Sequence, residues 1–270
     1  MNDDSLRPIG GALGAPTLAL VVAYDGAGFS GFARQPGQPT IQGELEQALS
    51  VVLRRPIEVV CAGRTDAGVH ALGQVVSFPC AENDIDAGAL RRSLNALVRD
   101  GIVVREVKWA LPGFSARFDA ISREYRYRIV AGRVPPLFLR NVAWSTPRTL
   151  DIEAMREGSV HLIGEHDFKS FCLTEAAVGR RTHRRMDEIE IVEEEHLGER
   201  CIVVRVVGNA FLRSMVRVVV GTLVEVGAGR QEPGWVAGAL AACDRGAAGP
   251  TAPAKGLTFW RVEYRDGVWL

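Results

Sequence analysis

The sequence predicts an α/β protein of the α+β kind, with two similar halves whose mainly antiparallel sheets flank a central cleft. Short β-branched apolar runs alternate with segments of helical periodicity. The first half gives the order strand, helix, two strands, helix, strand, which is the split-βαβ, ferredoxin-like pattern. A similar order starts again after Pro112. We therefore expect a loose tail over residues 1–16, an N-terminal half over 17–112 and a C-terminal half over 113–270.

Each element of the first half follows from the spacing of its apolar residues. Residues 17–24 form a β-branched apolar run, which is typical of a buried strand. Apolar residues then recur at helical spacing from Ile41 to Leu53, and Thr40 is placed to cap that helix. The remaining predicted elements are strands at 57–61 and 74–78, a helix from Asp86 to Leu97 and a strand at 102–109.

The second half is predicted in the same way, and its most apolar segment is a long helix over residues 211–226. Asp151 is the expected cap of a helix that runs to Ile163. The other predicted elements are strands at 123–130, 186–192, 201–207 and 256–264, and a shorter helix at 235–243.

Length and composition exclude several classes of protein. The 270 residues are 47% hydrophobic and 24% charged, which is ordinary for a globular chain and excludes a disordered or collagen-like one. Five cysteines without a CxxC pair fit a reducing compartment. The N-terminus lacks the apolar core of a signal peptide, and the apolar run from Val216 to Ala228 is too short to span a bilayer. We therefore expect a cytoplasmic protein without membrane contact.

The charge balance is neutral, with 32 basic and 32 acidic residues, so net charge does not favour a nucleic-acid partner. The basic set nevertheless contains 29 arginines and only three lysines. High-GC codon usage explains such a bias, and so does a need for rigid forks that bind phosphate or carboxylate. The sequence alone leaves both explanations open.

A literal GxGxxG, Gly26 to Gly31, follows the first predicted strand. In a dinucleotide-binding domain this motif opens a helix whose N-terminus binds the pyrophosphate. Here Pro36 and Pro39 interrupt the segment that should be helical, and no acidic residue ends a second strand about 20 residues further on. A glycine-rich turn is the better interpretation, and a nicotinamide-dependent oxidoreductase the poorer one.

The loop CAGRTDAGVHA, residues 61–71, connects two predicted strands. Gly63 and Gly68 allow turns that other residues resist. Between them, Arg64 and Asp66 are close enough for the guanidinium to touch the carboxylate and keep it ionised. An ionised, partly buried carboxylate is a candidate nucleophile. A turn-stabilising Asp satisfied by its Arg is the structural alternative, and spacing alone favours it.

Read whole, GRTDAGVH closely resembles the catalytic motif of the TruA family of tRNA pseudouridine synthases. The resemblance extends along nearly the full chain. Segments similar to the family's other motifs are YDG at 24–26 with Arg34-Gln35, IQGELEQAL at 41–49, FSARFDA at 114–120, REYRYRI at 123–129, FKSF at 168–171, NAFLRSMVR at 209–217, the following VGTLVEVG, and Gly256-Leu257.

This resemblance implies the isomerisation of uridine to pseudouridine at positions 38, 39 and 40 of the tRNA anticodon stem-loop, on a central RNA-binding cleft. It places Asp66 as the nucleophile and Arg64 at the target phosphate, where it helps to flip the base. It places Tyr125 on one face of the uracil and Leu257 on the other, and it pairs Arg217 with the catalytic carboxylate. The family forms homodimers, so a homodimer is expected.

The implied reaction explains why these residue types are needed. Pseudouridine has the same atoms as uridine, so the chemistry requires no redox cofactor, metal or second substrate. The N1–C1′ bond breaks, the base rotates without escaping, and C5 joins C1′. The carboxylate has three possible routes, attack at C1′, attack at C6 or assistance of a glycal, and the sequence does not choose among them. A non-catalytic RNA-binding module of the same fold is the alternative function.

Further basic residues gain a role only if RNA is the partner. Arg123, Arg126 and Arg128 alternate with two tyrosines, and Arg180, Arg181, Arg184 and Arg185 surround His183. For the 180–185 run we expect contacts with backbone phosphates. Phe32-Ala33 stands where the family usually has Trp-Gln, and GRRTHRR also departs from the family's pattern.

Other candidate residues are expected to be structural. His161 and His166 are poorly spaced for a metal pair. Nothing in the sequence brings Cys172 and His183 together as a thiol nucleophile and its base. His70 is expected to buttress its loop.

Overall fold

The computed structural model describes residues 16–80 and 85–270, so the tail predicted for residues 1–16 lies, apart from Pro16, outside the described residues. In the first half of the chain the elements are β1 (Thr17–Tyr24), α1 (Ile41–Leu53), β2 (Val60–Cys61), β3 (His70–Pro79), α2 (Ala87–Leu97) and β4 (Ile102–Ala110). In the second half they are β5 (Ala120–Ala131), β6 (Trp144–Thr146), α3 (Ile152–Ser159), β7 (Gly164–Asp167), α4 (Thr174–Ala177), β8 (His183–His196), β9 (Glu199–Gly208), α5 (Met215–Gly227), α6 (Trp235–Ala241) and β10 (Leu257–Tyr264).

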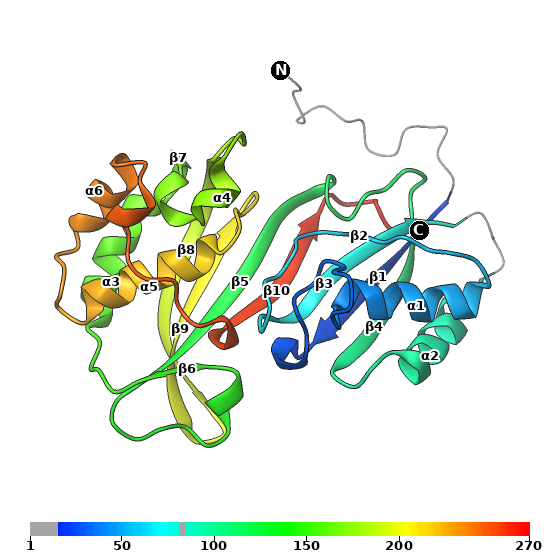
Figure 1. Ribbon diagram of the computed structural model, residues 1–270, viewed down its shortest axis with the longest axis horizontal. Helices are drawn as coiled ribbons and strands as arrows, with labels where there is room; N and C mark the ends of the chain where they lie inside the picture. Colours follow the sequence, from blue (N-terminus) through cyan, green and yellow to red (C-terminus); the bar gives the residue numbers. More distant parts are fainter. Residues whose placement is uncertain (1–15, 81–84) are drawn as a thin grey trace.

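The strands of both halves form one continuous sheet (Figure 1). Its order is β4-β1-β3-β10-β5-β9-β8-β7, with β2 beside β3 and β6 beside β5. Among the described residues, every pairing between these strands is antiparallel except β10 with β3 and β5 with β6. The predicted α+β class with mainly antiparallel strands is therefore confirmed. The two halves differ from the prediction in sharing one sheet.

The last strand, β10, joins the two halves. It pairs with β5 along most of its length and with β3 only at Thr258↔His70 and Phe259↔Ala71. His70 ends the GRTDAGVH loop, so this short parallel contact places the loop beside the middle of the sheet. Strand β5 lies next to β10 and carries Tyr125.

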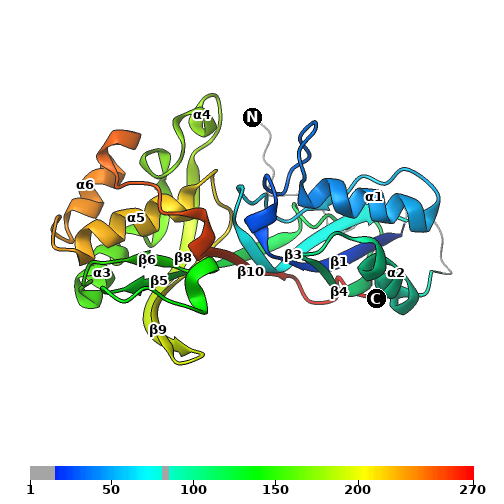
Figure 2. The same cartoon turned by 60° about the horizontal axis from the view of Figure 1, so that its bottom comes forward.

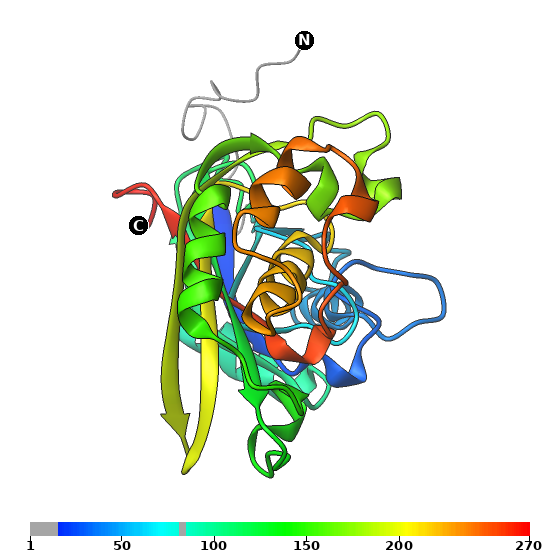
Figure 3. The same ribbon diagram turned by 90° about the vertical axis from the view of Figure 1, so that its left-hand side faces the viewer.

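The helices on either side of this junction lie on the same face of the sheet, as Figure 3 shows for α1 and α5. Helix α5 is apolar around nearly its whole circumference and is almost fully buried, as expected for a helix at the centre of a core. Its valines and leucines are largely withdrawn from water, and each such burial contributes about 1.5–3 kcal/mol. One apolar cluster includes buried residues from both halves.

Two predicted elements begin later than expected. The helix predicted from Phe211 starts at Met215, because Ser214 adopts a left-handed conformation with φ 62° and ends the preceding loop. The strand predicted from Ile57 is reduced to Val60–Cys61, because the amide of Val59 donates to Oε1 of Glu46 instead of to a neighbouring strand.

Other elements are longer or shorter than the apolar patterns indicate. The predicted strand pair at 186–192 and 201–207 is confirmed and extends to 183–196 and 199–208. The helix predicted to Ile163 is α-helical to Ser159 and ends in a 3₁₀ turn, Val160–Leu162. Within residues 16–80 and 85–270, each helix is too short or too polar to reach across a bilayer.

Candidate functional site

The loop that carries Asp66 lies between β2 and β3 and is fixed by hydrogen bonds from Tyr24 and Phe32. The amide of Phe32 donates to the carbonyl of Thr65 at 3.0 Å, and the hydroxyl groups of Tyr24 and Thr65 are hydrogen-bonded at 2.8 Å. The amide of Val69 donates to the carbonyl of Asp66 at 3.1 Å, which closes the turn. Thr65 is buried, whereas the Asp66 side chain is 22% exposed. The backbone on both sides of Asp66 is therefore fixed while its carboxylate can reach solvent.

The first and third glycines of GxGxxG, Gly26 and Gly31, pack closely against this loop. A Cβ on Gly26 would lie 2.1 Å from the carbonyl oxygen of Val69, so only glycine fits there. Gly31 has φ +95°, and a Cβ on it would lie 3.0 Å from the carbonyl oxygen of Thr65. The segment after Gly26 forms a 3₁₀ turn and a loop, and α1 begins only at Ile41. The glycine-rich-turn interpretation is confirmed.

Three side chains from the second half surround the carboxylate of Asp66. Oδ2 accepts a 2.7 Å hydrogen bond from Oγ of Ser214 and a 3.0 Å hydrogen bond from Nη1 of Arg217. The Nε atom of Arg213 lies 3.8 Å from Oδ1, and the Arg213 side chain is 65% exposed. Within the described part of the chain, no hydrogen bond reaches Oδ1. One carboxylate oxygen is therefore held and the other is open.

Arg217 is itself fixed by a segment that packs on α5. Its Nε donates to the carbonyl of Ala252 at 2.8 Å, and the amide of Ala252 donates back to the carbonyl of Arg217 at 3.0 Å. Helix α5 and this segment approach each other closely, as shown by Gly221, where an added Cβ would lie 1.8 Å from the carbonyl oxygen of Pro250. The amide of Gly249 donates to Oγ1 of Thr222 at 3.0 Å. The guanidinium of Arg217 is therefore held at both of its ends.

Tyr125 lies beside the Asp66 loop in an aromatic group. Its ring makes edge-on contacts with Phe211 and Phe259, at centroid distances of 5.0 and 4.9 Å. A Cβ on Gly63 would lie 3.6 Å from the Tyr125 hydroxyl oxygen, which shows how near this hydroxyl is to the loop. Burial raises the pKa of Tyr125 well above its ordinary value, so the phenol is neutral at physiological pH.

Leu257 is the buried first residue of β10 and lies opposite Tyr127 in the register. Tyr125 lies opposite Phe259, two residues along the same strand. Because side chains alternate across a strand, Leu257, Phe259 and both tyrosines share one face of the sheet. A Cβ on Gly256 would lie 2.5 Å from the ring of Tyr127, so glycine is needed before Leu257.

The proximity predicted for Arg64 and Asp66 does not occur. Arg64 is exposed, and among the described residues no ion pair joins it to Asp66. Arg217 and Arg213 supply the cationic neighbours instead.

The arginines that alternate with Tyr125 and Tyr127 have structural partners. Arg123 is buried and donates to the carbonyls of Ala62, Arg117, Ala120 and Asn209, which ties the Asp66 loop to the second half. Arg126 pairs with the buried Glu124 at 2.8 Å and stacks over Trp260 at 4.0 Å from its centroid. Arg128 lies over the same ring at 5.4 Å. Arg126 and Arg128 face away from Tyr125, because their positions on the strand alternate with it, whereas Arg123, two residues from Tyr125, shares its face.

The 180–185 run follows α4 and includes the first three residues of β8, near the loop that carries Arg213. The amide of Leu173, just before α4, donates to the carbonyl of Arg213 at 3.4 Å. Arg180 and Arg181 are exposed, and Arg181 forms a surface ion pair with Glu165. Figure 2 shows α4 and the loop before α1 rising on the same side of the sheet. One of these projections comes from each half of the chain.

The remaining candidate residues lie in structural positions. Cys172 is buried with its thiol directed to the carbonyl of Lys169 at 3.5 Å, and burial raises its pKa, which does not suit a nucleophile. His183 is exposed on β8. His70 is buried, and its Nδ1 contacts the amide of Gly26 at 3.2 Å and Oδ1 of Asp25 at 3.0 Å. No group of three metal-ligating side chains occurs among residues 16–80 and 85–270.

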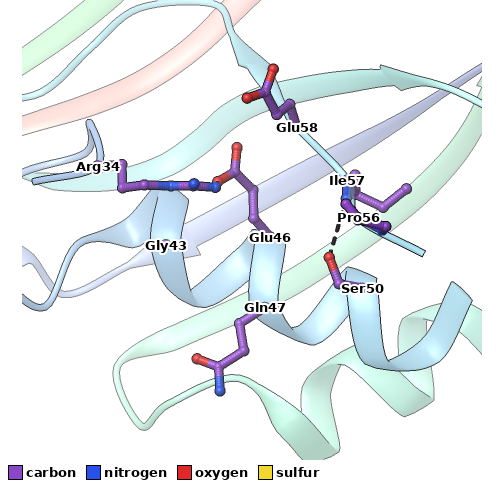
Figure 4. Close-up of a pocket in the computed structure, with 8 residues that line it drawn as sticks. All are labelled: Arg34, Gly43, Glu46, Gln47, Ser50, Pro56, Ile57 and Glu58. Atoms are coloured by element: carbon purple, nitrogen blue, oxygen red, sulfur yellow. Dashed lines mark hydrogen bonds and ion pairs between the residues drawn. The ribbon is translucent and has the colours of Figure 1, made fainter. Parts of the chain in front are cut away.

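A shallow hollow on α1 is separate from Asp66 (Figure 4). It is lined by Arg34, Gly43, Glu46, Gln47, Ser50, Pro56, Ile57 and Glu58. Glu46 is buried and ion-paired to Arg34, and it also accepts from the amide of Val59. The pair thereby anchors the loop before α1, which contains Phe32 and Ala33. Phe32 is buried in the core and only 6.4 Å from the ring of Tyr24.

Local sequence patterns do not single out Ser214 or the two phenylalanines around Tyr125. Ser214 lies inside the NAFLRSMVR segment, but the apolar periodicity runs through it and predicts an ordinary helical residue. Phe211 was assigned to the same helix, and Phe259 to the interior of the last strand. Their common location depends on strand pairing and on the turn at Ser214, which local spacing does not encode.

Comparisons with known proteins agree with this arrangement. A family described as tRNA pseudouridine synthase matches residues 20–119 and 159–265. A protein named tRNA pseudouridine synthase A from Brevibacillus brevis is 46% identical over 247 residues, covering 92% of this chain and 99% of that protein. Proteins of the same name from Bacillus licheniformis and Bacillus subtilis are 43% and 42% identical, each covering 92% of this chain and 98% of its own length.

The likeness to solved structures is much weaker. A structure titled "Crystal Structure of a Cbf5-Nop10-Gar1 Complex" aligns with a TM-score of 0.37 and 17% identity, covering 83% of this chain and 49% of that chain. A TM-score this low carries no argument.

The family match defines the class of this protein as an RNA-modifying enzyme. The chain belongs to the tRNA pseudouridine synthase family. Enzymes of this family convert uridine in tRNA into its isomer pseudouridine, and the family expected from GRTDAGVH is confirmed.

Proposed function

We propose that this protein isomerises uridine to pseudouridine at positions 38, 39 and 40 of the tRNA anticodon stem-loop, with Asp66 as the nucleophile. Membership in the family supports the reaction and the tRNA substrate. The observation that carries the role of Asp66 is its carboxylate, which Ser214 and Arg217 hold through Oδ2 while Oδ1 stays open. A fixed anion with one free oxygen is what a positioned nucleophile requires.

The bound uracil would lie between Asp66 and the apolar face of the sheet. Tyr125 is held edge-on by Phe211 and Phe259, so its ring offers a rigid surface beside the loop. Leu257 shares that face and would cover the other side of the base. Such a clamp keeps the detached base from escaping after the N1–C1′ bond breaks, and it excludes water.

The reaction balances within the nucleoside. The N1–C1′ bond breaks, the uracil turns, C5 bonds to C1′, and the proton of C5 is released as N1 gains one. Attack of Oδ1 at C1′, attack at C6 and the glycal route all use the same carboxylate. A base in a stacked stem is out of reach, so the target uridine is flipped at a cost of a few kcal/mol. The exposed Arg64 would hold the target phosphate and favour this flipped state.

The decisive experiment measures tritium release from tRNA labelled at C5 of uridine. The parental protein is expected to release tritium, and Asp66→Asn is expected to release none while its tRNA affinity stays within about tenfold, or about 1.4 kcal/mol. Asp266→Asn, which changes an exposed aspartate, is the matched control and should keep full activity. An active Asp66→Asn enzyme would remove Asp66 as the nucleophile.

The same assay separates the enzyme from a non-catalytic RNA-binding module. A binding module retains tRNA but releases no tritium. Mapping pseudouridine in tRNA before and after treatment then identifies the modified positions, and modification outside positions 38 to 40 would refute the proposed site. We further propose that the protein acts as a cytoplasmic homodimer, which sedimentation at several concentrations tests.

A further inference from the structure

Ser214 occupies the N-cap position of α5 but does not cap it. An N-cap residue normally has extended backbone, and its side-chain oxygen accepts from an amide of the first turn. Ser214 has φ 62° and ψ 6°, which is the left-handed region, and its side chain makes no capping hydrogen bond. Such a conformation is costly for a residue with a Cβ and persists only where its surroundings impose it.

Other helices of the protein show the ordinary arrangement. Thr40, Asp86 and Asp151 have extended backbone at the N-caps of α1, α2 and α3, and each accepts from an amide of its first turn. Leu173 and Gly234, at the N-caps of α4 and α6, have no side-chain oxygen, so among the described α-helices the one N-cap residue that could cap and does not is Ser214. Its hydroxyl instead donates to Oδ2 of Asp66 at 2.7 Å, across 148 residues of sequence.

The loop that presents Ser214 is anchored at several points. The amide of Asn209 donates to the carbonyl of Arg185 at 3.0 Å, and the amide of Met215 donates to the carbonyl of Leu212 at 3.0 Å. The carbonyl of Ser214 accepts from the amide of Val218 at 3.0 Å, so the main chain enters the helix directly. Met215 is buried in the core. These contacts fix the turn and with it the direction of the hydroxyl.

We propose that Ser214 is a positioning residue, which gives up capping α5 to hold the carboxylate of Asp66 in its reactive orientation. Arg217 and Ser214 approach the same oxygen and together prevent the carboxylate from rotating. Oδ1, which accepts no hydrogen bond in the described part of the chain and lies 3.8 Å from Nε of the exposed Arg213, is thereby left for the substrate. This role rests on the proposed function of Asp66 as the nucleophile.

Three substitutions separate the hydroxyl from the backbone conformation. Ser214→Gly adopts positive φ freely and lacks the hydroxyl. Its kcat for tritium release is expected to fall about tenfold, or about 1.4 kcal/mol, with the KM for tRNA within about twofold. Ser214→Ala should lose as much kcat and have a lower Tm than Ser214→Gly. Ser214→Asn tolerates the left-handed region and offers an amide donor, so its kcat should recover to within about threefold.

The control is Asp151→Ala, which removes an ordinary N-cap from α3 and should lower Tm without changing kcat. The positioning role alone would be overturned if Asp66→Asn is inactive in the same assay while Ser214→Gly keeps a kcat within about twofold of the parental value. A Ser214→Asn enzyme no faster than Ser214→Gly would also count against it. An active Asp66→Asn enzyme would overturn the nucleophile first and the positioning role with it.

Discussion

Nη1 of Arg217 donates a 3.0 Å hydrogen bond to Oδ2 of Asp66, although 151 residues separate the two in the sequence. Its Nε donates to the carbonyl of Ala252, so one guanidinium links the Asp66 loop, helix α5 and the segment before β10. Both charged side chains are only about a fifth exposed, at 19% for Arg217 and 22% for Asp66. An ion pair this sheltered contributes more free energy than a surface pair, and it fixes the orientation of the carboxylate.

Replacing Arg217 should therefore affect the chemical step. Arg217→Ala leaves the Asp66 carboxylate with one donor fewer in a sheltered site, and we expect kcat/KM to fall by about a hundredfold, or about 2.7 kcal/mol. Arg217→Lys cannot hold the carboxylate and the Ala252 carbonyl together and should restore only part of the rate. Tritium release under single-turnover conditions measures both. Arg230→Ala, which removes an exposed pair with Glu225, is the control. Equal rates for Arg217→Ala and Arg230→Ala would contradict this account.

The close approach at Gly221 gives a second prediction. A Cβ there would lie 1.8 Å from the carbonyl oxygen of Pro250, so Gly221→Ala must displace the segment that holds Arg217. We expect the free energy of unfolding to fall by about 1–3 kcal/mol, with a loss of kcat. Gly238→Ala in α6 meets open space and should instead stabilise the protein by about 0.5–1 kcal/mol. Chemical denaturation measures both changes, and an unchanged Gly221→Ala protein would show that the segment yields easily.

Local patterns predicted most of the secondary structure but not how its parts meet. The apolar run at 17–24 and the helix from Ile41 are found where the spacing indicates. The insertion of β10 between β3 and β5 depends on pairing between residues far apart in the sequence, and periodicity carries no information about such partners. This insertion is why one sheet replaces the two that were expected.

For the candidate site, too, local patterns do not show which distant residues come into contact. Spacing indicates Asp66 as a residue of interest and pairs it with Arg64, which is exposed and, among the described residues, forms no ion pair with Asp66. The partner that does contact it, Arg217, was expected only from the family resemblance. Ser214 was missed because helical propensity and apolar spacing describe an average backbone, whereas its left-handed turn is imposed by tertiary contacts.

The exposed arginines at 180 and 181 give a prediction about salt dependence. If they contact phosphates, the double substitution Arg180→Ala/Arg181→Ala should weaken tRNA binding and lower the slope of log affinity against log salt by about one to two. The matched control is Arg91→Ala/Arg92→Ala, which removes the same charge from exposed positions of α2. Fluorescence anisotropy with labelled tRNA at several salt concentrations measures the slopes. Identical slopes for the two double variants would exclude phosphate contacts by Arg180 and Arg181.

Glu124 gives a prediction about acid stability. Its carboxylate is buried, with Nε of Arg126 and Arg261 each 2.8 Å and Nε of Arg205 3.2 Å from its oxygens. Burial acts to raise the pKa of Glu124, but the hydrogen bond and charges of the arginines outweigh it, so the pKa is lowered. A carboxyl whose pKa is lower in the folded state stabilises the fold above its unfolded pKa of about 4.3. That contribution is lost as the pH falls through the folded value.

Glu124→Gln should therefore destabilise the protein at pH 7 by about 2 kcal/mol and have little effect in acid, where the native carboxyl is protonated. Urea unfolding of both proteins from pH 7 down to pH 3 should show the two stabilities converging below about pH 4. Glu193→Gln, at an exposed position of β8, provides the control and should follow the parental protein throughout. A constant difference between Glu124→Gln and the parental protein over the whole range would mean that the arginines stabilise the fold without depending on the charge of Glu124.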